Sequence, residues 1–94
     1  MGENMTAIVA VEILSKEDQL KEEFYHFFSA KEGDKKTRYR MNLKFILKNG
    51  GTAILLGESI SFMPDEFYGK DEFGSWIEIP LSSVIDIVPM PKKI

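Results

Sequence analysis

Residues 38–48, RYRMNLKFILK, alternate between apolar and polar side chains over most of their length, and this segment constrains the fold more than any other. A period of two predicts a strand that buries one face and exposes the other to water. Asn49, Gly50 and Gly51 follow, and these residue types tolerate positive φ. The chain can therefore turn tightly and return as TAILLGESISFM, residues 52–63, which predicts a β-hairpin.

The second half of the chain continues this β pattern. Gly57, inside the return strand, indicates a bulge or a sharp bend at which one sheet curls across another. Residues 75–81, SWIEIPL, alternate again, and strand pairing should end at Pro80, which has no N–H to donate. After a short turn, residues 84–88 predict a last strand, and Pro89 is expected to end regular structure.

The first part of the chain predicts a strand and then a helix. TAIVAVEIL, residues 6–14, is rich in β-branched residues and suits a buried strand. Ser15 is a candidate N-cap for a helix within 16–32, with Gly33 as its C-terminal stop. An alternative is a strand over 23–30, which would make the fold all-β. The expected helix has one apolar stripe, formed by Leu20, Phe24, Phe27 and Phe28.

These elements predict an α+β, mostly β fold: a small antiparallel barrel or roll with one N-terminal helix. The 94 residues are 44% hydrophobic and 29% charged, as in a single globular domain over 1–94, whose ends at 1–5 and 89–94 are expected to fray. The expected core consists of Val9, Val11, Phe24, Phe27, Leu43, Phe45, Ile54, Leu56, Ile60, Ile77, Ile79, Ile85 and Ile87.

The order of these elements resembles that of small Sm-like or SH3-like barrels over residues 15–88. The resemblance is one of architecture. The segment SFMPDEF, which follows Ile60, and the last turn, PLSSV, carry none of the RNA-contacting pattern of Sm proteins, and an Arg-Gly pair is missing from that turn. The resemblance therefore implies a fold and no RNA-binding role.

Composition argues against several classes of function. The chain has no Cys and one His, His26, so thiolate chemistry, a conventional metal site and a Ser-His triad are not expected. No phosphate-binding glycine motif is present, and we expect no cofactor and no enzyme activity. No apolar run is long enough to cross a bilayer, and the lack of Cys fits a cytoplasmic protein. We expect no membrane partner.

Nucleic-acid binding is the alternative function. Arg38, Arg40, Lys44 and Lys48 share one parity along the predicted strand and could follow a phosphate backbone. The net charge of −3 opposes this role, and an antiparallel sheet commonly places charges on its wet face. The acidic balance therefore favours a solvated face, and we treat nucleic acid as an unlikely partner.

The leading functional hypothesis concerns PDEFYGKDEFGSW, residues 64–76, which has the appearance of a long loop. Stiff aromatic rings within an acidic rim are typical of protein interfaces, so we expect a non-enzymatic interaction module with an unknown, preferably basic, protein partner. The opposing interpretation is a lid that buries its rings. A homodimer through 6–14 is also possible. The candidate partner-binding residues are Asp65, Glu66, Phe67, Tyr68, Asp71, Glu72, Phe73 and Trp76.

Overall fold

The computed structural model describes residues 15–91, so the expected strand 6–14 and the expected frayed end at 1–5 lie outside the described residues. The first element is helix α2 (Lys16–Ser29), which begins as expected: the Ser15 side chain accepts a hydrogen bond from the Asp18 N–H at 3.1 Å. Leu20 and Phe24 are its buried residues. The alternative of a strand over 23–30 is wrong. Within 15–91, no helix combines the length and the apolar character needed to span a membrane.

The helix ends earlier than Gly33, so the expected stop is wrong. Strand β1 (Lys31–Glu32) follows almost at once and pairs with β2 (Tyr39–Arg40) in a small two-stranded sheet. Gly33, with φ of 96°, lies in the turn between these strands, where a Cβ would come within 2.7 Å of the Thr37 carbonyl oxygen. Asp34 shapes the same turn by accepting hydrogen bonds from the N–H groups of Lys36 and Thr37, each at 2.9 Å.

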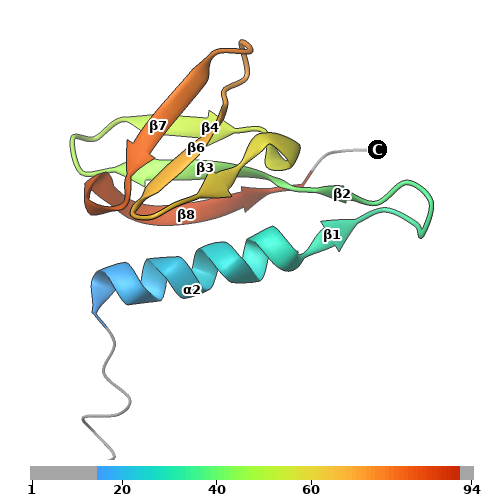
Figure 1. Ribbon diagram of the computed structural model, residues 1–94, viewed down its shortest axis with the longest axis horizontal. Coiled ribbons are helices and arrows are strands. Elements are labelled where there is room, and N and C mark those ends of the chain that lie inside the picture. Colours follow the sequence, from blue (N-terminus) through green and yellow to red (C-terminus); the bar gives the residue numbers. More distant parts are fainter. Residues whose placement is uncertain (1–14, 92–94) are drawn as a thin grey trace, which may run out of the picture.

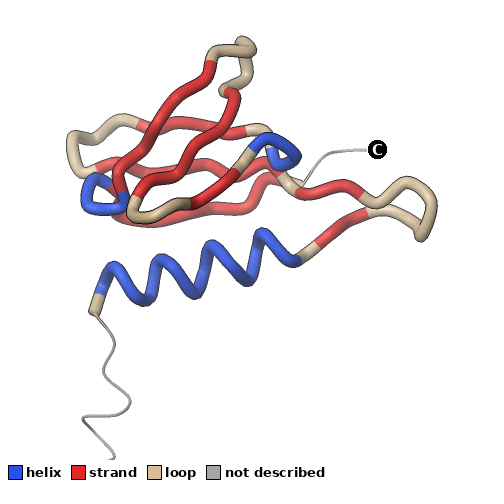
Figure 2. The backbone as a smooth tube through the Cα atoms, viewed as in Figure 1, coloured by secondary structure: helices blue, strands red, loops and turns tan. Residues whose placement is uncertain are grey.

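Two three-stranded antiparallel sheets form the rest of the fold (Figures 1 and 2). Their strand orders are β4-β3-β8 and β5-β6-β7. The strands are β3 (Asn42–Leu47), β4 (Thr52–Leu55), β5 (Ser61–Phe62), β6 (Glu66–Lys70), β7 (Trp76–Pro80) and β8 (Val84–Met90). Two 3₁₀ turns, η1 (Gly57–Ser59) and η2 (Leu81–Ser83), interrupt them. Over residues 15–91, the result is an α+β, mostly β fold with one helix and three small antiparallel sheets.

The alternating segment 38–48 does form a hairpin with the chain that follows it. Leu43 and Phe45 of β3 are buried, and Gly50 has a positive φ of 88° in the turn. The Leu47 N–H closes this turn by donating to the Gly51 carbonyl oxygen at 2.9 Å. The strand is not continuous, however, because Met41 separates β2 from β3.

Gly57 marks the bend at which the chain passes from one sheet to the other, as the sequence predicts. A Cβ on Gly57 would overlap the carbonyl oxygens of Arg40 and Met41, so the close approach of these backbones requires glycine. Just before the bend, the Leu56 N–H donates to the Lys70 carbonyl oxygen at 2.9 Å. The segment 52–62 therefore connects both sheets.

The helix and the two sheets share one core. In Figure 1, α2 runs along β8 beneath the sheets. The Phe24 ring lies 4.9 Å from the Phe67 ring, which in turn lies 4.8 Å from the Phe45 ring. Within 15–91, the backbone pairing forms separate sheets and no closed barrel, because β7 and β8 are joined through η2 without pairing with each other. A closed barrel was one form of the expected fold, and it is not observed.

Several predicted core positions differ in detail. Phe24, Leu43, Phe45, Ile60, Ile79 and Ile87 are buried as expected. Ile85 is 43% exposed, because the pairing of β3 with β8 shifts at this point and leaves Ile85 as an extra residue in a bulge. At the end of β4, Leu55 is buried, whereas the expected Ile54 and Leu56 on either side of it are half-buried. Phe27 and Ile77 are half-buried beside the core, and Val9 and Val11 lie outside the described residues.

Pro89 does not end regular structure, and β8 continues to Met90. Pro89 pairs with Leu43, but among residues 15–91 β3 is the only strand that pairs with β8, so the other edge of β8 requires no N–H there. The expectation of a frayed end at 89–94 is therefore wrong for residues 89 and 90, and 92–94 lie outside the described residues.

Candidate interaction surface

The acidic and aromatic segment 64–76 is a hairpin rather than a loop. It contains all of β6 and the first residue of β7, with a turn between them. In β6, Phe67 and Gly69 are buried while Glu66 and Tyr68 are half-buried, so the segment alternates as a strand does. The sequence suggests a loop here because Gly69, on the buried side of β6, has no apolar side chain, so the alternation of apolar and polar residues is hard to recognise.

Phe67 belongs to the core, and this burial argues against the partner-binding role that the sequence suggests for it. Its side chain has 0% exposure. Its ring centroid lies 4.6 Å from that of Phe62 and within 5 Å of those of Phe24 and Phe45. A partner could not touch Phe67 without opening the core.

Asp71 holds the turn that joins β6 to β7. One of its carboxylate oxygens, Oδ1, accepts hydrogen bonds from the N–H groups of Phe73 and Ser75, each at 2.9 Å. Two backbone hydrogen bonds close the turn, from Asp71 to the Ser75 carbonyl oxygen and from Gly74 to the Asp71 carbonyl oxygen. Gly74 supplies the positive φ of 85°. This arrangement fixes the backbone at Phe73, whose side chain is 89% exposed.

The outward side chains of β6 and β7 form a continuous surface beside this turn. Tyr68 lies opposite Glu78, and Lys70 lies opposite Trp76. Trp76 is 66% exposed, and the Lys70 ammonium lies 5.4 Å from the centroid of its ring. We call this surface, with the exposed residues of the turn, the hairpin face: Glu66, Tyr68, Lys70, Glu72, Phe73, Trp76 and Glu78.

Electrostatics on the hairpin face are dominated by carboxylates. The pKa of the Tyr68 phenol is raised, first by partial burial and then by the negative charges of Glu66 and Glu78. Glu72 adds a third carboxylate near the turn, and Lys70 is the one cation of this face. The face can therefore attract a cationic group, and Trp76 already attracts one from its own chain.

The structure brings most of the expected partner-binding residues together, with three exceptions. Phe67 is in the core and Asp71 is occupied by the turn. Asp65 lies at the opposite end of β6 from Phe73, where its carbonyl oxygen accepts a hydrogen bond from Leu81 at 2.8 Å. Sequence reasoning missed Lys70 and Glu78, although the alternation of SWIEIPL already placed Glu78 on the same face of its strand as Trp76.

The basic residues of the nucleic-acid alternative do not form one row. The Arg40 guanidinium lies 3.9 Å from the centroid of the Phe28 ring on α2, and the backbone N–H of Arg40 donates a hydrogen bond to Glu58 Oε1 at 2.8 Å. Lys44 is half-buried on the other side of β3 from Leu43, between Ile54 and Val88 of the neighbouring strands. Arg38 precedes β2, and Lys48 follows β3. The break at Met41 separates these side chains, so no shared face supports the role.

Within 15–91, no three His, Asp or Glu residues are grouped so that they could hold a metal ion.

Comparisons of the chain with protein-family models, with curated proteins and with solved structures found no match.

Proposed function

We propose that this protein is a non-enzymatic interaction module that docks a basic segment of a partner protein on the hairpin face. The observation that carries the proposal is the exposure of Phe73, an 89% exposed ring on a turn held by four hydrogen bonds. Large apolar side chains at a fixed, exposed position are the usual anchors of protein interfaces.

The rigid turn favours binding for an entropic reason. Association normally costs free energy for ordering the loops and side chains of an interface. Asp71 already orders the backbone of Phe73, so a partner would gain the burial of the ring, about 1.5–3 kcal/mol when it is complete, with little of that cost. Trp76 extends the same apolar contact along β7.

Charge identifies the chemistry of the partner. Glu66, Glu72 and Glu78 surround the aromatic groups, against the single cation Lys70. A Lys or Arg of the partner could replace the Lys70 ammonium over the Trp76 ring and pair with these carboxylates. Binding should therefore weaken as salt concentration rises.

We also propose that the fold is a small roll of the SH3-like or Sm-like kind. The strand order supports this assignment, because the segment 52–62 passes from one sheet to the other and the meander continues through η2 to β8, which returns to β3. The assignment concerns architecture, and the proposed function rests on the hairpin face alone.

The experiment combines cross-linking with matched variants. A photoreactive phenylalanine analogue placed at Phe73 should yield a discrete adduct in extracts of the source cells, and the partner is then purified. We expect Phe73→Ser and Trp76→Ser each to weaken its binding by roughly tenfold or more. Ile85→Ser is the control, because Ile85 is an exposed apolar residue on β8, outside the hairpin face. Equal binding by all three variants would contradict the proposal.

A further inference from the structure

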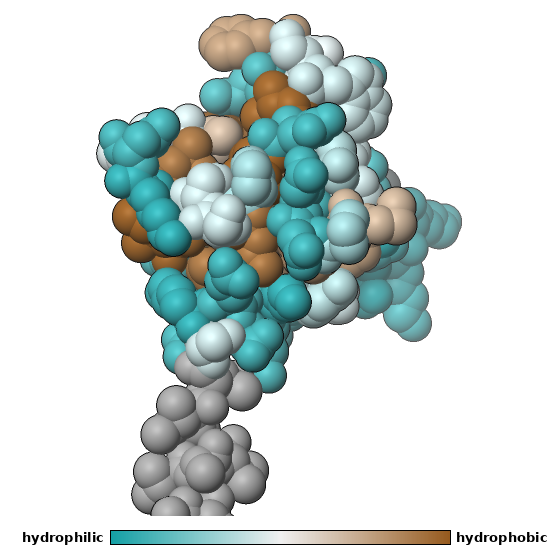
Figure 3. Space-filling view, turned by 60° about the vertical axis from the view of Figure 1, so that its left-hand side comes forward, coloured by the Kyte–Doolittle hydropathy of each residue, from teal (hydrophilic) through white to brown (hydrophobic). Residues whose placement is uncertain are grey.

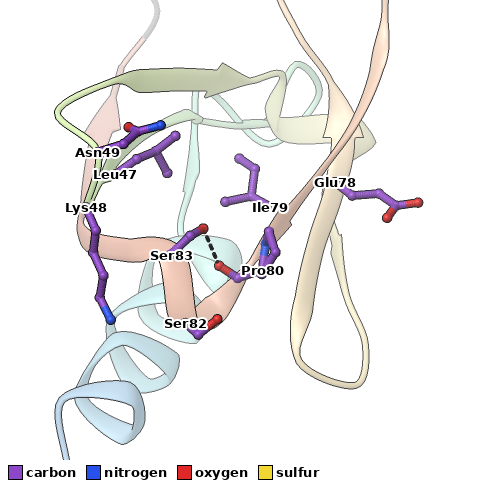
Figure 4. Close-up of a pocket in the computed structure, with 8 residues that line it drawn as sticks. All are labelled: Leu47, Lys48, Asn49, Glu78, Ile79, Pro80, Ser82 and Ser83. Carbon is purple, nitrogen blue, oxygen red and sulfur yellow. Dashed lines mark hydrogen bonds between the residues drawn. The ribbon is translucent and has the colours of Figure 1, made fainter.

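A groove of about 440 Å³ lies between the end of β3, strand β7 and η2 (Figure 4). Leu47 and Ile79 point toward each other across it, while the Glu78 side chain points away. Lys48 lines the groove on the side of α2. The space-filling view of this end of the molecule shows hydrophobic surface gathered between hydrophilic margins (Figure 3).

The groove runs beside an unpaired strand edge. Within 15–91, β7 pairs with β6 and with no other strand. Two backbone hydrogen bonds lie at the ends of this pairing, from the Asp71 N–H to the Ser75 carbonyl oxygen and from the Leu81 N–H to the Asp65 carbonyl oxygen. Along an antiparallel strand, every second residue directs its backbone groups to the paired strand. Counted from Ser75 and Leu81, the residues of β7 that do so are Ile77 and Ile79. The backbone groups of Trp76 and Glu78 therefore point to the opposite edge. An unpaired edge beside an apolar groove is a template for an additional extended segment.

We propose that residues 6–14 of the same chain, TAIVAVEIL, occupy this groove as an extended segment hydrogen-bonded to β7. The segment has no Gly or Pro, its one charged residue is Glu12, and its β-branched composition favours a strand. Side chains of one parity, such as Val9 and Val11, would lie on the apolar floor. The peptide groups would satisfy the outward backbone of Trp76 and Glu78.

The position of α2 supports this occupant. Residues 6–14 lead directly into Ser15, the N-cap of α2, and the N-terminal end of α2 lies on the same side of the molecule as η2 and the β3–β4 turn (Figure 1). In Figure 4, the first turns of α2 lie below Lys48, next to the groove. An extended segment rises about 3.3 Å per residue, so 6–14 spans roughly 30 Å and can cover the whole edge of β7.

This inference is independent of the proposed function. The outward side chains of Trp76 and Glu78 belong to the hairpin face, while their backbone groups point to the edge of β7 that does not pair with β6. Docking of 6–14 therefore leaves the hairpin face accessible. Either proposal can fail while the other holds.

Amide hydrogen exchange of the full chain, followed residue by residue by NMR, tests the inference. The amides of Trp76 and Glu78 should exchange at least roughly tenfold more slowly than unprotected amides, at all protein concentrations. The double variant Val9→Asp, Val11→Asp should abolish this protection. The amides of Ile77 and Ile79 should stay protected in the variant, which shows that the sheet is intact. Asn4→Asp, which adds a charge outside the segment, should change nothing.

Three results would overturn the inference. One is fast exchange of Trp76 and Glu78 in the unmodified chain. Another is protection that persists in the double variant, which would assign it to a different occupant. The last is protection that grows with protein concentration, which would assign the groove to a second copy of the chain.

Discussion

Two phenylalanines in similar local sequences have opposite roles in this protein. Phe67 and Phe73 both end the tripeptide DEF. Phe67 is in a strand, at a position that faces the core, whereas Phe73 is in a turn whose backbone is held by Asp71. Local sequence did not distinguish them, because the burial of Phe67 depends on the pairing of β6 with its neighbours, whereas Phe73 lies in the turn beyond β6.

This difference predicts opposite effects on stability. Phe67→Ala should lower the free energy of unfolding by about 3–5 kcal/mol, because it leaves a cavity among three other rings. Phe73→Ala should change it by less than about 0.5 kcal/mol, because the side chain has few contacts to lose. Urea unfolding of the two variants gives both values. A large loss for Phe73→Ala would show that its ring is packed.

Helix α2 shows which parts of an element local sequence determines. Its N-terminus is local, since Ser15 accepts a hydrogen bond from Asp18 within the same turn. Its C-terminus is not, because the helix ends where β1 begins to pair with β2. The local sequence therefore predicts a helix stop at Gly33, whereas Gly33 serves the turn of the following hairpin.

The cap gives a prediction for this element. Ser15→Ala should destabilise the protein by about 1 kcal/mol, because it leaves the Asp18 N–H without its side-chain acceptor. Ser29→Ala, at the other end of α2 and also exposed, is the matched control and should change stability by less than about 0.5 kcal/mol. Thermal or urea unfolding measures both effects. Equal losses would mean that the cap contributes nothing specific.

At the scale of the whole molecule, two tyrosines couple folding to alkaline pH. The pKa of Tyr68 is raised by partial burial and by the charges of Glu66 and Glu78. The pKa of Tyr39 is raised by partial burial and by Glu32. In both cases the phenol has a higher pKa in the folded state than in the unfolded chain. The contribution of this difference to the free energy of unfolding is therefore fully present below the ordinary pKa of 10.0, and it is lost as pH rises through the pKa of the folded protein.

We therefore expect the free energy of unfolding to fall as pH rises above about 10. The double variant Tyr39→Phe, Tyr68→Phe should show a shallower fall over the same range, because it lacks both titrating groups. Urea midpoints compared at about pH 8 and about pH 11 provide the measurement. A fall of the same steepness in the variant would exclude these two groups as its cause.

The sequence by itself determined the features that depend on neighbouring residues: the Ser15 cap, the strand character of 42–47, the glycine turn and the bend at Gly57. It also showed that acidic and aromatic residues are concentrated in 64–76, and most residues of the hairpin face belong to this segment. The tertiary structure alone decided which side of β4 and of β6 is buried. Strand pairing sets that choice over long distances: it buried Leu55 and Phe67, left Phe73 exposed and placed Ile85 in a bulge. Local patterns limit the possible elements, but only the partner strands fix their register, since a shift of one residue exchanges the two faces.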